Sequence, residues 1–469
     1  MGGPRARRLG MGKVQPAYAL GTALVLLATL CAPTAALAAE DTLDQDQQQE
    51  LQDLRERVEW LEADQQWTEQ RVNQAIQSSS KLSGYVDFGF FRVTGDGRGI
   101  RSDLGYRVLP EYEGVVADSW VFLGDPLSTA INSRGDPADV AESRAVTFDA
   151  VGNRGKPSFI LNAVNVQYFT GVGDDLTVNA MVDLLARGRN VSDPDGVAYG
   201  DVVDVKLGYI EYRLPTPGLE LSLFAGKFDS VLGVEYRTQE APSRLSVTPS
   251  LICRYTCGRP LGVKARAQLL DRQLTLNLAA TNGSHSIEGF PIYNEVDLNS
   301  GKTIAGRLSY DFALGAKFEL GASGSYGAQD LQPQDDVIHW HYGVDLSLDV
   351  ANVLLDAEFV QGNLQGLGEP GEAPCNLAPC LDYRGAYGLL GYRATNWLTP
   401  YARLDWRDAL HQNGASFVYV SQLARSTLGL RSELGTHIVV KGEYTFNREL
   451  GVLPQIPNNI LATSLVGRF

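Results

Sequence analysis

From Lys81 to the C-terminus, apolar and polar residues alternate with a period of two, in about sixteen short runs. In one run, Leu274 and Leu276 share one side, while Thr275 and Asn277 share the other. Successive side chains of a β-strand point to opposite faces, so each run predicts a strand with one apolar and one polar face. The runs lie near 81–93, 158–170, 174–187, 201–214, 218–228, 259–270, 272–281, 301–312, 315–327, 338–350, 352–362, 381–394, 398–408, 418–433, 436–447 and 458–469.

The connections between these runs alternate between short and long. Segments 215–217 and 395–397 are short, whereas 94–157, 229–258 and 409–417 are long. This alternation is typical of a membrane β-barrel with tight turns on the periplasmic side and loops on the outer side. It predicts an even number of strands, with both ends of the barrel domain on the periplasmic side.

No stretch after residue 39 is apolar over the roughly 18 residues that a transmembrane helix requires. An exported chain that spans a membrane must then pair its backbone groups in a closed barrel. A soluble β-sandwich would bury its apolar faces inside instead. We therefore predict an all-β protein, whose residues 81–469 form a transmembrane antiparallel β-barrel of about 16 strands.

The N-terminal 80 residues carry two other signals. Residues 1–39 combine a basic start, an apolar stretch and small residues at the end, which is typical of a secretory signal peptide. Residues 40–80 form a second unit, in which 43–77 repeat apolar positions with a 3-4 spacing and contain no Gly or Pro. This spacing predicts a periplasmic coiled-coil helix for oligomerisation, and a homotrimer is the expected assembly.

Composition excludes one class of partner and leaves two options for the cysteines. The formal net charge of -15 argues against nucleic-acid binding, which requires a basic surface. Four cysteines beyond the signal peptide fall into two close pairs, Cys253 with Cys257 and Cys375 with Cys380. In an oxidising compartment two local disulfides are expected. A zinc site is the alternative, although no His lies near either pair in the sequence.

Charged residues on the polar faces are the candidates for the pore lining. The runs near 338–362 supply mostly acids, and those near 259–270 and 398–441 supply more bases. Such charges would bias ion selectivity across a lumen, or would only neutralise one another and keep the lumen wet. The long connection 229–258 is expected to fold inward, and 94–157 is a second such loop. The predicted constriction comprises Glu235, Arg237, Arg244, Arg254, Arg403, Arg407, Arg425 and Arg431.

No catalytic motif is found, and we expect no enzymatic activity and no cofactor. The sequence has no Gly-x-Ser-x-Gly and no phosphate-binding Gly loop. His339 and His341 share one strand face, but two ligands are too few for a metal site, and a solvated pair is the expected role. A Ser–His–acid site on the barrel wall is an alternative that a motif search does not exclude.

The last twelve residues, from Asn458 to Phe469, form one predicted strand that ends in an aromatic residue. This end resembles the closing strand of bacterial outer-membrane β-barrels, and the resemblance implies that Phe469 is the signal read by the barrel-assembly machinery. We expect this strand to pair with the run at 81–93 and shut the barrel. Both assignments of its outward face, with either Leu461 or Ile460 outside, fit the sequence.

A second resemblance covers about forty residues. It runs through Ala225-Gly-Lys-Phe-Asp-Ser-Val-Leu-Gly-Val-Glu-Tyr236, Glu240-Ala-Pro242, Arg254-Tyr255 and Arg259-Pro-Leu-Gly-Val263. This segment resembles the outer-membrane β-barrel porins of the OmpL-like group, and the N-terminal coiled coil is more weakly similar to the phosphate-selective porins. The chain departs from the OmpL-like pattern at Ser243 and Arg244 and by its cysteine pair.

The expected function is that of a porin in the outer membrane of a bacterial cell. The resemblance implies a water-filled channel for passive diffusion of small polar or charged solutes, surrounded by outer-membrane lipid. The alternative is a structural or adhesive barrel with a plugged lumen and ligand-binding outer loops.

Overall fold

The computed structural model describes the chain from Ser80 onward, with gaps. The described residues are 80–93, 121–122, 157–173, 175–184, 191–192, 198–199, 203–216, 218–285, 297–312, 317–329, 333–378, 380–414, 417–450 and 459–469. The predicted signal peptide and coiled coil lie outside them, as does most of connection 94–157. Among the described residues, no helix is long and apolar enough to cross a membrane.

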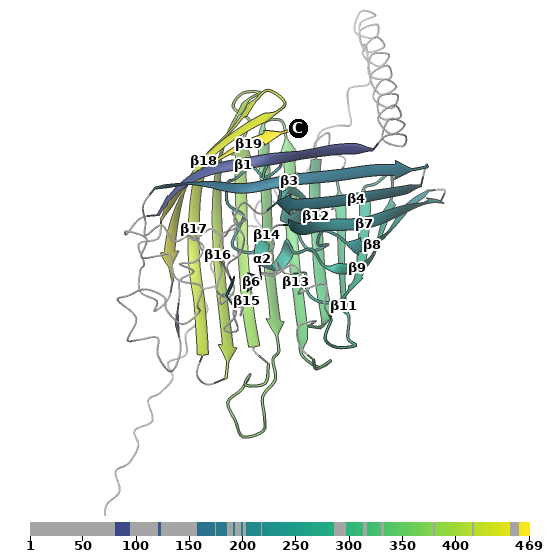
Figure 1. The fold of residues 1–469 in the computed structure, drawn as a ribbon, viewed down its shortest axis with the longest axis vertical. Helices are drawn as coiled ribbons and strands as arrows, with labels where there is room; N and C mark the ends of the chain where they lie inside the picture. Colours follow the sequence, from purple (N-terminus) through teal and green to yellow (C-terminus); the bar gives the residue numbers. More distant parts are fainter. Residues whose placement is uncertain are drawn as a thin grey trace, which may run out of the picture. The chain divides into compact units, whose positions relative to one another are not determined.

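Sixteen long strands form the wall of one closed antiparallel barrel (Figure 1). The first eight are β1 Lys81–Val93, β3 Ser158–Val172, β4 Leu176–Leu184, β7 Val203–Thr216, β8 Leu219–Lys227, β9 Leu261–Leu269, β10 Leu274–Thr281 and β11 Thr303–Asp311. The other eight are β12 Lys317–Ala328, β13 Ile338–Val350, β14 Val353–Leu364, β15 Cys380–Tyr392, β16 Leu398–Asn413, β17 Phe417–Leu434, β18 Ile438–Glu449 and β19 Ile460–Arg468. The predicted runs therefore all correspond to strands.

Three further strands of two residues each and two short helices complete the described elements. The short strand β2, Val121–Phe122, runs parallel to β17, and β5, Val191–Ser192, pairs with β6, Ala198–Tyr199. The 3-10 helix η5, Glu235–Thr238, and the helix α2, Cys253–Thr256, lie between β8 and β9.

The barrel closes between its first and last strands, as predicted. Antiparallel pairing of β1 with β19 runs from Tyr85 opposite Arg468 to Val93 opposite Ile460. Outside this register, the Phe469 amide donates to the Gly84 carbonyl at 3.0 Å, which extends the seam to the last residue. Closure leaves no unpaired edge on the long strands.

Short connections of two to five residues join β3–β4, β7–β8, β9–β10, β11–β12, β13–β14, β15–β16 and β17–β18, as predicted. The prediction of a long connection at 409–417 was wrong, because β16 continues to Asn413 and β17 begins at Phe417. Alternation simply continues through His411 and Gln412, which pair with Tyr419 and Val418. Gly414 then adopts a φ of +61°, a left-handed conformation that glycine tolerates in a tight turn.

Outward side chains of the wall are mostly apolar, whereas the charged ones mostly point inside. On β10, Leu278 is exposed whereas Asn277 and Thr281 are buried. On the closing strand β19, Leu461 and Leu465 are exposed, and Ile460, Ala462, Ser464 and Val466 are buried. The structure thus resolves the two alternatives for β19 in favour of Leu461 outside.

Candidate functional site: the lumen and its inner loop

The connection between β8 and β9, residues 228–260, lies inside the barrel, and we call it the inner loop. Phe228, Val231 and Leu232 pack against Ala279 of β10 and Ala305 of β11. These two wall positions carry small side chains, which leaves room for the larger apolar groups of the loop. Burying such groups stabilises by about 1.5–3 kcal/mol each. Figure 1 shows α2 of this loop within the outline of the barrel.

Three wall carboxylates accept hydrogen bonds from backbone amides of the inner loop. The Glu358 carboxylate of β14 accepts from the Val234 and Glu235 amides at 2.7 and 2.6 Å. Gly233, directly before them, has a φ of +68°, and a Cβ there would collide with this carboxylate. Charge-assisted hydrogen bonds of this kind are about twice as strong as neutral ones.

The second and third carboxylates lie on β16 and β18. The Glu443 carboxylate accepts from the Val247 and Thr248 amides at 2.8 and 3.0 Å. The Asp405 carboxylate accepts from the Leu251 amide at 3.1 Å. Together with Glu358, these acids fix residues 234–235 and 247–251 of the loop to the β14–β18 side of the barrel.

Wall cations on the same side donate to carbonyl groups of the inner loop. Arg403 donates to the Thr248 carbonyl at 2.6 Å, and Arg431 donates to the Arg244 carbonyl at 2.8 Å. The Lys441 ammonium donates to the carbonyls of Ala241 and Ser246 at 2.8 and 3.0 Å. These three wall cations thus bind backbone carbonyls of the inner loop.

Glu240 ties the inner loop to the β1–β7 side of the barrel. Its carboxylate accepts from the Tyr85 hydroxyl at 2.5 Å and from Lys206 at 3.2 Å, and it also pairs with Arg259. Burial opposes the charged form, but Lys206 and Arg259 outweigh it and hold the pKa of this carboxyl well below its ordinary value. The loop therefore spans the lumen and is bound on both sides.

A ladder of alternating charges runs from the loop down the β11–β13 wall. Arg237 of the loop pairs with Glu319 of β12 at 2.9 Å, and Arg307 of β11 bridges Glu319 and Asp345 at 2.6 and 2.5 Å. Arg307 has no exposed side-chain surface, whereas 32% of the Arg237 side chain is exposed. Arg237 is consequently the member of the ladder that a solute in the lumen can reach.

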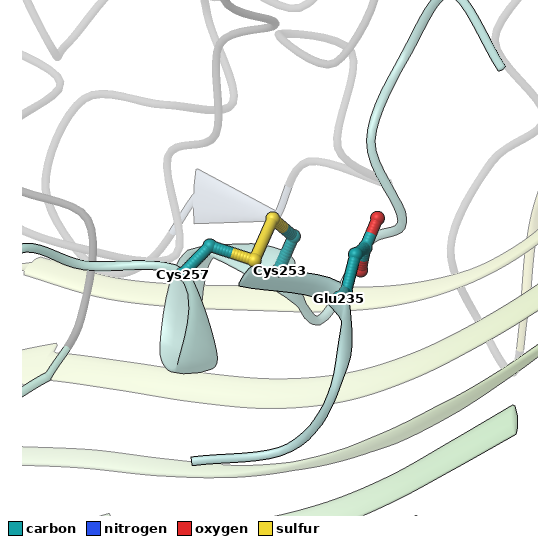
Figure 2. A group of neighbouring side chains, drawn as sticks. All are labelled: Glu235, Cys253 and Cys257. Atoms are coloured by element: carbon teal, nitrogen blue, oxygen red, sulfur yellow. A yellow bond between two sulfur atoms is a disulfide. The ribbon is translucent and has the colours of Figure 1, made fainter. Parts of the chain in front are cut away.

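Cys253 is the first residue of α2 and Cys257 follows its last residue, and their sulfur atoms are joined (Figure 2). The Glu235 carboxylate lies beside them, within 4.8 Å of both sulfur atoms. Sulfurs joined in a disulfide are not thiolate ligands, and both carboxylate oxygens already accept bonds from Ser250. Burial raises the pKa of Glu235, while Arg403 and Ser250 act in the opposite direction. The arrangement fits an oxidised structural pair. The second pair joins Cys375, in the connection between β14 and β15, to Cys380, the first residue of β15.

The histidines are hydrogen-bonded and buried. His339 and His341 both contact the Tyr383 hydroxyl, at 2.9 and 2.8 Å, so the expectation of a solvated pair was wrong. Tyr255 of α2 stacks on the Tyr383 ring, which covers this site with the loop. His285 lies 3.1 Å from the Ser230 hydroxyl, and burial together with Lys264 lowers its pKa to about 3. Ser230 is 0% exposed, so this Ser–His pair is closed to substrates.

The predicted constriction residues fall into three groups. Glu235, Arg237, Arg244 and Arg254 lie on the inner loop. Arg403 and Arg431 bind the loop backbone, as described above. Arg407 and Arg425 are buried on the inner face of β16 and β17, where Arg425 donates to Asn447 at 3.0 Å.

The anchoring set also contains residues outside that prediction. Glu358, Asp405, Lys441 and Glu443 lie on predicted strand runs, and Glu240 lies in the segment that resembles the OmpL-like group. The acids on β13 and β14 and the bases on β16 to β18 lie on adjoining parts of the wall rather than across the lumen. The inner loop, which carries both charges, lies against both parts.

No protein-family model matches the chain, and no curated protein matches it. Among solved structures, the chain is similar to OmpT, an outer membrane protein of Vibrio cholerae, with 9% identity, 83% of this chain and 97% of that chain covered, and a TM-score of 0.45. It is also similar to the outer membrane channel DcaP of Acinetobacter baumannii, with 11% identity, 83% and 97% covered, and a TM-score of 0.46. OmpF of Salmonella typhi in complex with daunomycin gives 12% identity, 84% and 99% covered, and a TM-score of 0.47.

Proposed function

We propose that this protein is an outer-membrane porin that lets small polar or charged solutes diffuse passively through a water-filled channel. The observation that carries the proposal is the distribution of side chains on the barrel wall, which is apolar outside and charged inside. A closed sheet with this distribution fits a lipid environment, because its backbone is fully paired and its polar groups face the lumen. The proposed role requires no catalysis and no cofactor.

The inner loop forms the proposed constriction. Arg237, Arg244 and Arg254 with Glu235 supply its side chains, and Arg403, Arg407, Arg425 and Arg431 supply the facing wall. Within this set, Arg403 and Arg431 hold the loop in position, whereas Arg237 and Arg244 retain exposed surface. Solute selection then depends on the loop arginines, and the position of the loop depends on the wall arginines.

The rest of the chain fits the same location. Residues 1–39 direct export, 40–80 form a periplasmic coiled coil, and the assembly machinery reads Phe469 at the end of the closing strand. The barrels associate as homotrimers in the bacterial outer membrane, and the two cysteine pairs are oxidised there. No bound nucleic acid is expected for a chain with a net charge of -15.

Planar-bilayer recording tests the proposal. The purified protein should insert and give discrete conductance steps. Replacing Arg237 and Arg244 by Gln should move the reversal potential in a salt gradient toward cation preference, because two reachable positive charges are lost. An unchanged reversal potential would show that these two arginines do not determine ion selectivity.

One observation favours a second candidate, a structural or adhesive barrel with a plugged lumen. The inner loop is bound to strands on two sides of the wall, through Glu240 at β7 and through Glu358 at β14. A loop held in this way occupies part of the lumen. Bilayers that contain the protein but show no conductance steps would support this reading over the channel.

A further inference from the structure

The inward face of β8 and β9, next to the inner loop, carries two cations that lie over an aromatic ring. Phe224 of β8 lies opposite Lys264 of β9 in the antiparallel register, and Ser222 lies opposite Arg266. The Lys264 ammonium is 4.5 Å from the centre of the Phe224 ring, and the guanidinium carbon of Arg266 is 5.1 Å from it. The same ring therefore positions both cations.

The inner loop adds a second ring to this arrangement. Phe228, the first residue of the loop, places its ring centre 4.7 Å from the Lys264 ammonium. Phe228 is fully buried and Phe224 is 5% exposed, so packing holds both rings in place. An aromatic face attracts a cation through its quadrupole, but it carries no net charge. The rings therefore fix the ammonium without neutralising it.

The Lys264 ammonium differs from two other inward lysines in its lack of an oxygen partner. Lys206 pairs with two carboxylates, and Lys441 donates to carbonyls of the inner loop. Among the residues that the structure describes, no oxygen accepts a hydrogen bond from Lys264. Since an ammonium has three donors, Lys264 can donate to an acceptor that enters from the lumen.

Arg266 also keeps donors for a ligand. One terminal nitrogen donates to Glu211 at 2.8 Å and to Ser222 at 3.4 Å, while Nε has no acceptor within the described part of the chain. Arg213 lies 3.6 Å from the same Glu211 carboxylate. Arg213, Lys264 and Arg266 thus share one carboxylate on this wall. The side chain of Arg266 is 37% exposed, so a solute can reach it.

Asp229 of the inner loop is a further carboxylate near Lys264, but other groups engage it. It accepts from Gln239 at 2.9 Å and from Arg259 at 3.1 Å. The wall formed by β7, β8 and β9, which are neighbours in the sheet (Figure 1), therefore keeps an excess of positive charge beside the loop.

We propose that Lys264 and Arg266 form a binding site for the acidic group of a small anionic solute, a carboxylate or a phosphate. The two residues are two positions apart on one strand, so their side chains point to the same face. An oxyanion between them would accept charge-assisted hydrogen bonds from the ammonium and from the remaining guanidinium donors. The inference rests on the proposed channel function and adds the class of solute that the lumen binds.

The position of the pair suits a solute in transit. Lys264 lies three residues after Leu261, where β9 begins next to the inner loop. A solute that passes the loop on this side meets the pair. Arg272, in the turn at the other end of β9, is 66% exposed and pairs with Glu220 at 2.9 Å. Arg272 is therefore a cation close in sequence whose charge is already compensated.

Isothermal titration calorimetry of the full-length protein in detergent tests the site, with propionate and inorganic phosphate as separate ligands at constant ionic strength. Lys264→Met removes the charge and keeps an unbranched side chain over the rings. We expect the wild type to bind at least one of the anions, and Lys264→Met to bind it at least tenfold more weakly. Lys264→Arg, which keeps the charge, should bind within severalfold of the wild type.

Arg272→Gln is the matched control, because it removes one positive charge away from the loop and should bind as the wild type does. Binding of propionate alone assigns a carboxylate site, binding of phosphate alone assigns a phosphate site, and binding of both assigns a general oxyanion site. A wild type that binds neither anion overturns the inference, as does equal weakening by Lys264→Met and Arg272→Gln. If Lys264→Met does not assemble, Arg266→Gln replaces it with the same expected loss.

Calorimetry requires no ion flow, so this inference and the channel proposal can fail separately. Anion binding without conductance steps in planar bilayers would refute the channel and support the site. Conductance steps without anion binding would refute the site alone.

Discussion

At the scale of single residues, several charged side chains of the lumen hold the inner loop in place. Glu358 and Glu443 accept loop amides, and Arg431 and Lys441 donate to loop carbonyls. Strand alternation predicted that these side chains point inward. It could not predict their partners, because those partners are backbone groups of a loop whose sequence has no repeating pattern.

Replacing Glu240 by Gln should weaken the inner loop. Lys206 and Arg259 would lose their shared carboxylate, and breaking a buried ion pair costs about 3–5 kcal/mol. We expect a lower midpoint of thermal unfolding, measured by circular dichroism in detergent. Ser243→Ala, at an exposed position of the same loop, is the control for substitution there.

The same variant predicts a pH dependence. The pKa of Glu240 is lowered in the folded state, so its stabilisation is fully present above the ordinary carboxyl pKa near 4.5 and is lost as pH falls through the lowered value. The stability difference between wild type and Glu240→Gln should stay constant from pH 7 to about 4.5 and shrink only at lower pH. A difference that disappears between pH 7 and 5 would contradict this assignment.

Gly233→Ala should displace the loop from Glu358. The residue has a left-handed φ of +68°, and the new Cβ would meet the carboxylate. We expect noisier and larger conductance steps, because the constriction is no longer fixed. Gly218→Ala is the matched control, since its φ of +73° imposes similar backbone strain but a Cβ there meets no atom within 4 Å. Equal effects of both variants would show that strain, and not the contact, matters.

At the scale of elements, the strands of the wall were predictable from the sequence, and the connections at their ends were less so. The period-two runs placed all sixteen long strands, since a half-buried strand imposes alternation on its sequence. The turn between β16 and β17 was missed because alternation through His411 was interpreted as part of a connection. The inward course of the inner loop was expected from its length alone. Its short helices η5 and α2 could not be predicted, because four residues are too few to show a helical period in the sequence.

The closing strand predicts an assembly defect. Deleting Phe469 removes the final pair of backbone hydrogen bonds, between this residue and Gly84, and the proposed signal. The fraction of heat-modifiable protein in outer-membrane preparations should fall severalfold. Phe446→Ala removes an exposed aromatic from β18 and should assemble normally. Normal insertion of the chain without Phe469 would refute the assembly role.

The two cysteine pairs should differ in their effects on the channel. Replacing Cys253 and Cys257 by Ser frees α2, which stacks on the wall through Tyr255, so conductance should change. Replacing Cys375 and Cys380 alters the connection between β14 and β15 and the first residue of β15, and should leave conductance as it is. Thiol titration of the unfolded wild-type protein should find both pairs oxidised. Free thiols, or equal effects of the two double variants, would contradict this assignment.

At the scale of the whole molecule, the sequence indicated a closed barrel through its alternation and its lack of a membrane helix. The pairing of β1 with β19 confirmed the closure. How much of the lumen stays open could not be predicted, because it depends on the three-dimensional course of one loop. The central claim is that this inner loop narrows a water-filled passage.

Conductance of Ser243→Cys before and after a charged methanethiosulfonate reagent tests this claim most directly. Ser243 is exposed on the inner loop, so modification should place a new charge in the passage. We predict discrete steps that shrink severalfold on modification, while Ser300→Cys, on an outer connection, keeps its steps. The absence of steps before modification, or steps that stay the same size once modification is complete, would contradict the account.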